Sequence, residues 1–175
     1  MAREVGDDWL TTVVLNNLGN VELNDGNFER AIELFEESLA LGEERGDMDR
    51  RARQLTNLGT ASLALGDRPA AAARFGDALD AARIIGLPEA YVYALLGLAA
   101  ASVTDDPPRA ARLQGVSDAI AEHLGSADDS FEAGIREQTL DNLRAASAED
   151  AYLEALTRAR GMSPNDAVAY ALDEL

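Results

Sequence analysis

Leu15-Asn16-Asn17-Leu18-Gly19 and Leu55-Thr56-Asn57-Leu58-Gly59 are two versions of one pattern, forty residues apart. The same offset relates the residues that follow them, namely Gly26 and Gly66, Ala31 and Ala71, Phe35 and Phe75, Leu39 and Leu79. A fixed period in small and large apolar residues is typical of stacked helical hairpins. We therefore expect an all-α array of hairpins, which offers a concave surface for holding another molecule.

The composition agrees with close-packed helices and excludes several classes of function. Of the 175 residues, 47% are hydrophobic but only 5% are aromatic, and alanine, the best helix former, makes up much of the difference. The net charge of −17 argues against binding of nucleic acid or an anionic membrane, because both require a positive surface. Lysine and cysteine are absent, which excludes Schiff-base chemistry, disulfides and thiolate metal sites. Without a signal-peptide pattern or a long apolar run, we expect a cytoplasmic protein that neither enters nor binds a membrane.

Helical periodicity and turn residues divide the chain into three predicted hairpins, at residues 7–46, 47–86 and 87–125, and a C-terminal helical cap at 126–175. In the first helix, from about residue 7 to 24, the apolar positions follow helical spacing at Leu10, Val14, Leu18 and Val21. The third hairpin is degenerate, since Gly115 falls near the position of the earlier phenylalanines. The cap contains three further predicted helices, of which the last begins after Ser163. Terminal units of such arrays are commonly atypical because they seal an apolar end.

The first two hairpins resemble tetratricopeptide repeats. The resemblance rests on Leu18-Gly19, Gly26, Phe28, Ala31, Phe35 and Leu39, and on Leu58-Gly59, Gly66, Ala71, Phe75, Ala78 and Leu79. It implies a right-handed superhelix of antiparallel helix pairs (an alpha-alpha superhelix) that binds proteins or peptides. The period of forty residues departs from the family's usual length of about 34, and leucine stands where the family has an early aromatic residue.

A second resemblance covers the tail. It rests on Arg109-Ala110-Ala111-Arg112-Leu113-Gln114-Gly115, Glu122-His123-Leu124-Gly125, Gly161-Met162-Ser163 and Ala167-Val168-Ala169-Tyr170-Ala171-Leu172. Together these segments are similar to the carboxyl-terminal ends of multidomain bacterial ATPase regulators, including LuxR-type transcription factors. The resemblance implies that the chain is the helical arm of a larger protein, whose nucleotide-binding switch and output domain lie outside these 175 residues.

The tetratricopeptide resemblance also implies where a ligand binds, because the first helix of each hairpin lines the groove in that family. Carried onto this sequence, the principal groove positions are Asn16, Asn20, Arg53, Asn57, Thr60 and Tyr91. Asparagine offers both a donor and an acceptor, as the main chain of an extended peptide requires. An alternative for Asn17 and Asn57 is a structural bond between neighbouring helices. The basic clamp that grips a carboxyl terminus in some family members is not reproduced, since only Arg53 could contribute.

The sequence contains no pattern that indicates catalysis, a cofactor or a metal site. The single histidine, His123, lies near the end of a predicted helix and is interpreted as structural or solvated. Asn24-Asp25-Gly26-Asn27 superficially resembles a calcium loop, but the required downstream acid is missing, so we interpret it as a hairpin turn.

The function that these features favour is therefore a non-enzymatic interaction module that holds a protein or peptide in its groove. We expect it to be the sensor or docking arm of a larger bacterial signalling or transcriptional regulator. The alternative is a freestanding adaptor or a self-associating scaffold, with a homodimer formed through exposed hairpin ends.

Overall fold

The computed structural model describes residues 2–43, 46–126 and 130–173, and this part of the chain contains nine α-helices and no strands. The helices are α1 (Ala2–Asn24), α2 (Phe28–Glu43), α3 (Met48–Ala64), α4 (Arg68–Ile85), α5 (Pro88–Ser102), α6 (Pro107–Leu124), α7 (Ser130–Ala145), α8 (Glu149–Ala159) and α9 (Pro164–Ala171). The all-α fold predicted from the sequence is confirmed. None of the helices in these residues combines the length and the apolarity needed to cross a bilayer.

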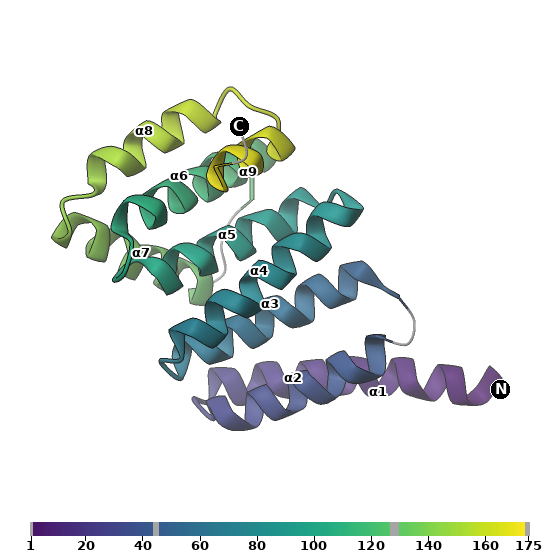
Figure 1. Ribbon diagram of the computed structural model, residues 1–175. Helices are drawn as coiled ribbons and strands as arrows, with labels where there is room; N and C mark the ends of the chain where they lie inside the picture. Colours follow the sequence, from purple (N-terminus) through teal and green to yellow (C-terminus); the bar gives the residue numbers. More distant parts are fainter. Residues whose placement is uncertain (1, 44–45, 127–129, 174–175) are drawn as a thin grey trace. The chain divides into compact units, whose positions relative to one another are not determined.

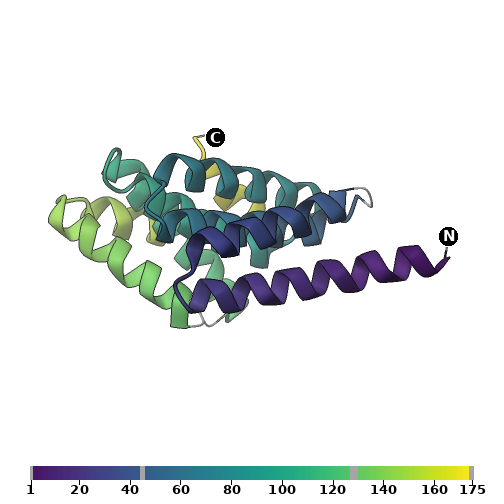
Figure 2. The ribbon, with the colours of Figure 1, turned by 90° about the horizontal axis from the view of Figure 1, so that it is seen from below.

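The chain divides into two compact units, Met1–Ile85 and Gly86–Leu175. The first unit contains two antiparallel hairpins, α1 with α2 and α3 with α4, and α3 packs on α2 (Figure 1). Figure 2 shows α1 running alongside α2 and continuing past it at the amino-terminal end. The turns within the two hairpins contain Gly26 and Gly66, whose φ angles of +82° and +88° favour glycine.

Each hairpin of the first unit is held by a glycine that lies under a phenylalanine ring. A Cβ atom added to Gly19 would lie 2.5 Å from Phe35 Cε1, and one added to Gly59 would lie 2.9 Å from three atoms of the Phe75 ring. Both rings are almost completely buried. The spacing between glycine and phenylalanine is the same in the two repeats because the same close approach of two helices occurs in both hairpins.

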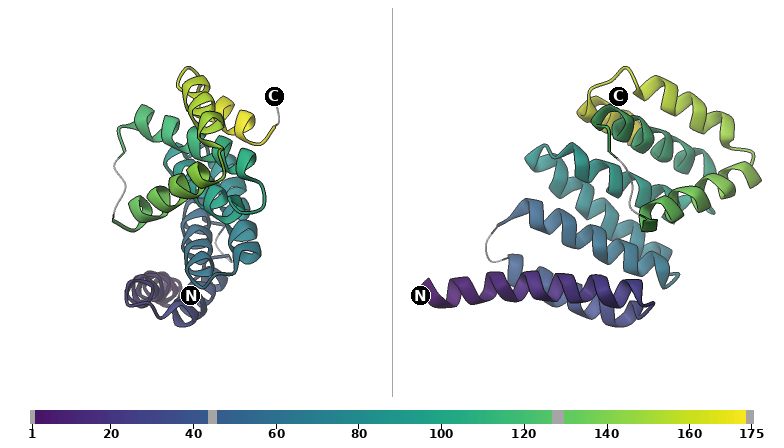
Figure 3. Two further views of the ribbon diagram at one scale, coloured as in Figure 1. Left: turned by 90° about the vertical axis from the view of Figure 1, so that its left-hand side faces the viewer. Right: turned by 180° about the vertical axis from the view of Figure 1, so that it is seen from behind.

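The second unit is built around α6, which contacts α5, α7, α8 and α9 (Figure 3). The closest approach is made by α8, since a Cβ atom on Gly115 would lie 2.7 Å from the backbone oxygen of Tyr152. This contact explains why glycine occupies a position near that of the phenylalanines in the earlier hairpins. The predicted third hairpin, α5 with α6, thus belongs to the same compact unit as the helices of the predicted cap at 126–175.

Capping side chains explain why several helix boundaries lie close to those predicted. Asp47 accepts a hydrogen bond from the backbone N–H of Arg50, and Asp106 accepts one from Arg109. At the last helix, Ser163 accepts one from the N–H of Asp166, as expected from the sequence. Each cap satisfies a backbone donor that the first turn of a helix leaves unpaired.

Candidate functional site

A shallow pocket of about 250 Å³ lies between α1 and α3 in the first unit. We call it the α1/α3 groove; it is lined by Thr12, Val13, Asn16, Asp47, Asp49, Arg50, Arg53 and Gln54. Both walls are first helices of their hairpins. The tetratricopeptide resemblance predicts a ligand surface on the first helices, and that role of the groove stays a prediction.

Asparagine side chains connect the two walls. The Nδ2 of Asn57 donates a hydrogen bond of 3.0 Å to the Oδ1 of Asn16. This contact agrees with the alternative considered for Asn57, a bond between neighbouring helices, whereas Asn17 is exposed on α1. An asparagine amide has two N–H donors and two acceptor lone pairs, and this bond uses one donor of Asn57 and one lone pair of Asn16. Asn16 thus combines a structural contact with a place in the groove wall.

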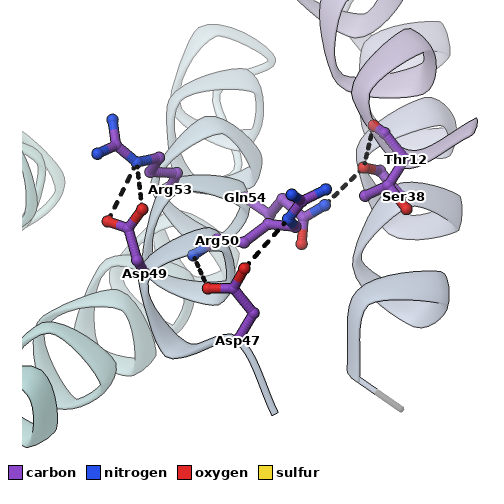
Figure 4. A network of polar contacts seen from close by, with 7 residues as sticks. All are labelled: Thr12, Ser38, Asp47, Asp49, Arg50, Arg53 and Gln54. Atoms are coloured by element: carbon purple, nitrogen blue, oxygen red, sulfur yellow. Dashed lines mark hydrogen bonds and ion pairs between the residues drawn. The ribbon is translucent and has the colours of Figure 1, made fainter. Parts of the chain in front are cut away.

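Charged side chains at the start of α3 form local pairs (Figure 4). The Nε of Arg53 lies 3.2 Å from both carboxylate oxygens of Asp49. The Nε of Arg50 lies 3.6 Å from the Oδ2 of Asp47. The guanidinium carbon of Arg50 is 5.9 Å from the centroid of the Trp9 ring. Because each arginine has an acid beside it, the four charged residues of the groove sum to zero. The groove is thus locally neutral in a strongly acidic protein.

A buried hydroxyl group on α2 is hydrogen-bonded to residues of both groove walls (Figure 4). The Oγ of Ser38, on α2, donates a hydrogen bond of 3.0 Å to the backbone oxygen of Thr12 on α1. The Ser38 Oγ also accepts a hydrogen bond of 2.5 Å from the Nε2 of Gln54 on α3. Ser38, Thr12 and Gln54 are all buried. Sequence reasoning missed this contact between three helices; its only signal was a pair of polar residues, Ser38 and Gln54, at otherwise apolar helix positions.

The predicted groove residues are only partly brought together. Asn16 and Arg53 line the groove, and Asn57 is bonded to Asn16. Asn20 on α1 and Thr60 on α3 are half-buried and are not among the lining residues. Tyr91 belongs to the second unit, where it is fully buried and its hydroxyl donates a hydrogen bond of 2.9 Å to the Oδ1 of Asn165. That position does not support a ligand-binding role for Tyr91, because the side chain is buried and its hydroxyl is bonded within the unit.

The second unit contains a separate polar cluster around Asp118 on α6. Its carboxylate accepts hydrogen bonds from Gln114 at 2.9 Å and from the Tyr152 hydroxyl at 2.8 Å, and it forms an ion pair with Arg136. Burial raises the pKa of the Tyr152 phenol above its ordinary value, so Tyr152 stays a neutral donor at physiological pH. Three donors satisfy the buried charge of Asp118. We therefore interpret the cluster as a brace that joins α7 and α8 to α6.

A pocket of about 420 Å³ adjoins this brace, and Glu122 is one of its lining residues. Glu122 accepts two hydrogen bonds from Arg160, of 2.7 and 2.8 Å. These bonds hold the pKa of the Glu122 carboxyl below its ordinary value. Within the described residues, no group of three or more histidine and acidic side chains is arranged to hold a metal ion.

The fold and the groove define a class of protein: an all-α array of antiparallel helical hairpins, of which two stack so that their first helices form the walls of a groove. Residues 10–84 match a family model described as "Tetratricopeptide repeat". This segment covers most of α1, the whole of α2 and α3, and all of α4 except its last residue, and the match supports a tetratricopeptide repeat there. Such repeats generally mediate protein–protein interaction. A comparison with curated proteins finds no match.

Proposed function

We propose that this protein is a non-enzymatic interaction module whose α1/α3 groove binds an extended segment of a partner protein. The observation that carries the proposal is the composition of the groove: an amide-bearing wall at Asn16 faces a wall whose charges are already paired. Such a surface suits the donors and acceptors of a peptide main chain. It suits a free carboxyl terminus less well, because Asp49 already occupies the Nε of Arg53.

The test uses a phage-displayed library of random peptides, selected on the immobilised full chain. Peptides that are enriched would be synthesised with a fluorophore, and their binding measured by fluorescence anisotropy. Asn16→Ala and Arg53→Ala should each weaken binding by about tenfold, which corresponds to about 1.4 kcal/mol. Helicity measured by circular dichroism should stay unchanged, because Arg53 is exposed and the Asn16 bond is half-buried.

Arg30→Ala is the matched control. Arg30 is also an exposed arginine in a local ion pair, with Glu33 on α2, and it does not line the groove. It should bind the selected peptides as the wild type does. Equal losses in Arg30→Ala and Arg53→Ala, or the selection of peptides that bind all variants alike, would contradict the assignment of the groove.

We also propose that the module is the sensor or docking arm of a larger bacterial signalling or transcriptional regulator in the cytoplasm. The support is the resemblance of four tail segments to the carboxyl ends of such regulators: 109–115, 122–125, 161–163 and 167–172. A partner bound in the groove would then act by shifting the equilibrium between two arrangements of the arm and its switch domain, which requires different affinities for the two.

A further inference from the structure

An apolar stripe runs along the exposed side of α1. We call it the α1 stripe; its residues and exposed fractions are Leu10 55%, Val14 61%, Leu18 42% and Val21 53%. Leu10, Val14, Leu18 and Val21 follow one another at intervals of three or four residues, so they share one face of the helix. Their helical spacing indicated an apolar face in the sequence, and among the described residues of the first unit this face is left exposed.

The internal repeat shows what kind of surface this is. Forty residues after Val14, Leu18 and Val21 stand Gln54, Leu58 and Ala61 on α3. These three are buried, with exposed fractions of 2%, 1% and 0%. Gln54 is bonded to Ser38 of α2, so this is the side by which α3 packs on a helix of the preceding hairpin. The equivalent side of α1 is thus a helix-packing face, on which valine replaces the polar Gln54 of α3.

The distribution of charge favours a second copy of this chain as the partner that covers the α1 stripe. Residues 9–21 contain no charged side chain, although the chain as a whole carries a net charge of −17. Two copies repel each other over most of their surfaces, and they can approach where neither presents a charge. A single straight stripe on one helix also meets the geometric requirement of a twofold contact, in which the same patch serves both partners.

We propose that the α1 stripe is a self-association surface, through which two copies of this chain pack their α1 helices against each other around a twofold axis. The groove lies on another side of α1, at Thr12, Val13 and Asn16. The dimer therefore does not depend on the proposed peptide binding, and either can fail alone.

The size of the stripe sets the expected strength of the dimer. Four half-exposed apolar side chains offer roughly 300–400 Å² per copy, comparable to the largest apolar patch of an ordinary monomer. Two such patches bury less than the 1,200 Å² or so typical of stable complexes. The dimer should therefore be weak, with a dissociation constant in the micromolar range or above, and should strengthen with salt as the like charges are screened.

Sedimentation velocity of the full chain tests this, over protein concentrations from about 1 to about 500 μM and salt concentrations from about 0.15 to about 1 M. The wild type should shift from monomer to dimer as concentration rises, and at lower concentration in high salt. Leu18→Glu places a carboxylate in the centre of the stripe and should weaken association at least tenfold. Leu153→Glu, the same change at a leucine of α8 that is 49% exposed, should dimerise as the wild type does.

Circular dichroism of each variant checks that it is folded, and Val14→Glu provides a second substitution at the most exposed position of the stripe. A wild type that stays monomeric over the whole range would overturn the proposal, since the occupant would then not be a second copy. A dimer that survives both Leu18→Glu and Val14→Glu, or that is lost equally in Leu153→Glu, would also overturn it by placing the contact elsewhere.

Discussion

Gly59→Ala should destabilise the first unit although alanine is the better helix former. The gain in helix propensity is about 1 kcal/mol. Against this, the new Cβ would lie 2.9 Å from three atoms of the Phe75 ring, which is buried and has little room to move. Forcing a methyl group into a packed core costs about 1–3 kcal/mol. Since the overlap involves three ring atoms, we expect the upper part of that range and a net loss of about 1–2 kcal/mol.

Gly76→Ala is the matched control. Gly76 lies in the same hairpin, inside α4, and a Cβ atom there would meet no atom within 4 Å. This variant should gain about 0.5–1 kcal/mol from helix propensity alone. The two variants make the same chemical change, so their expected difference of about 2 kcal/mol isolates the contact with the ring; in a unit of this size it corresponds to roughly 8–16 °C in Tm.

The assay follows urea and thermal unfolding of the full chain by the fluorescence of its single tryptophan. Trp9 belongs to the first unit and contacts Arg50 of α3, so its emission reports on the packing of the two hairpins. Phe75→Leu combined with Gly59→Ala should be more stable than the sum of the two single changes predicts, because the smaller side chain leaves space for the methyl group. If Gly59→Ala is as stable as Gly76→Ala, the close approach does not limit this position and the reasoning is refuted.

Three further predictions concern single polar contacts. Arg160→Gln should raise the pKa of Glu122 toward its ordinary value of 4.5, measured by NMR titration; the stability that the pair contributes is present above that pH and is lost as pH falls through the lowered pKa. Ser38→Ala should cost about 1–3 kcal/mol in urea denaturation, because the buried amide of Gln54 loses its acceptor. Ser163→Ala should cost the last helix about 1 kcal/mol, measured as faster hydrogen exchange in its first turn.

Each of these has an outcome that contradicts it. Arg158→Gln serves as the control for Glu122, since Arg158 lies over the Tyr170 ring; an equal pKa rise in both variants would show that general charge, not the hydrogen bonds, sets the value. An unchanged midpoint for Ser38→Ala would mean that another acceptor replaces the hydroxyl. Unchanged exchange in Ser163→Ala would show that α9 is held by packing alone.

The hairpins could be predicted from the sequence because they depend on local and repeated signals. The glycines at 26 and 66 mark turns that require positive φ, and Gly59 with Phe75 repeats the pairing of Gly19 with Phe35. Such features are encoded at fixed separations, so one chain that carries two copies makes them visible.

The exposure of the α1 face and the polar contacts between helices could not be predicted, because they depend on which surfaces meet in the folded chain. Periodicity identified the apolar face of α1 but not whether a neighbour covers it, since an apolar stripe has the same spacing whether it is buried or exposed. The brace at Asp118 joins residues 18 and 34 positions away, Arg136 and Tyr152, which share no repeat. Asn16 and Arg53, which the family resemblance singled out, both line the α1/α3 pocket, and their role in binding stays a prediction. The hydroxyl of Ser38, which bonds to both Thr12 and Gln54, had no counterpart in that resemblance.

The bridge at Ser38 has a consequence for the kinetics of the proposed peptide binding. One hydroxyl of α2 is bonded to both walls of the groove, at the Thr12 carbonyl on α1 and at Gln54 on α3. The separation of the walls is thus set by a buried third helix, and a ligand has no need to open or close them. Association should then occur in a single step, with an observed rate that rises linearly with ligand concentration and shows no plateau from a preceding conformational change.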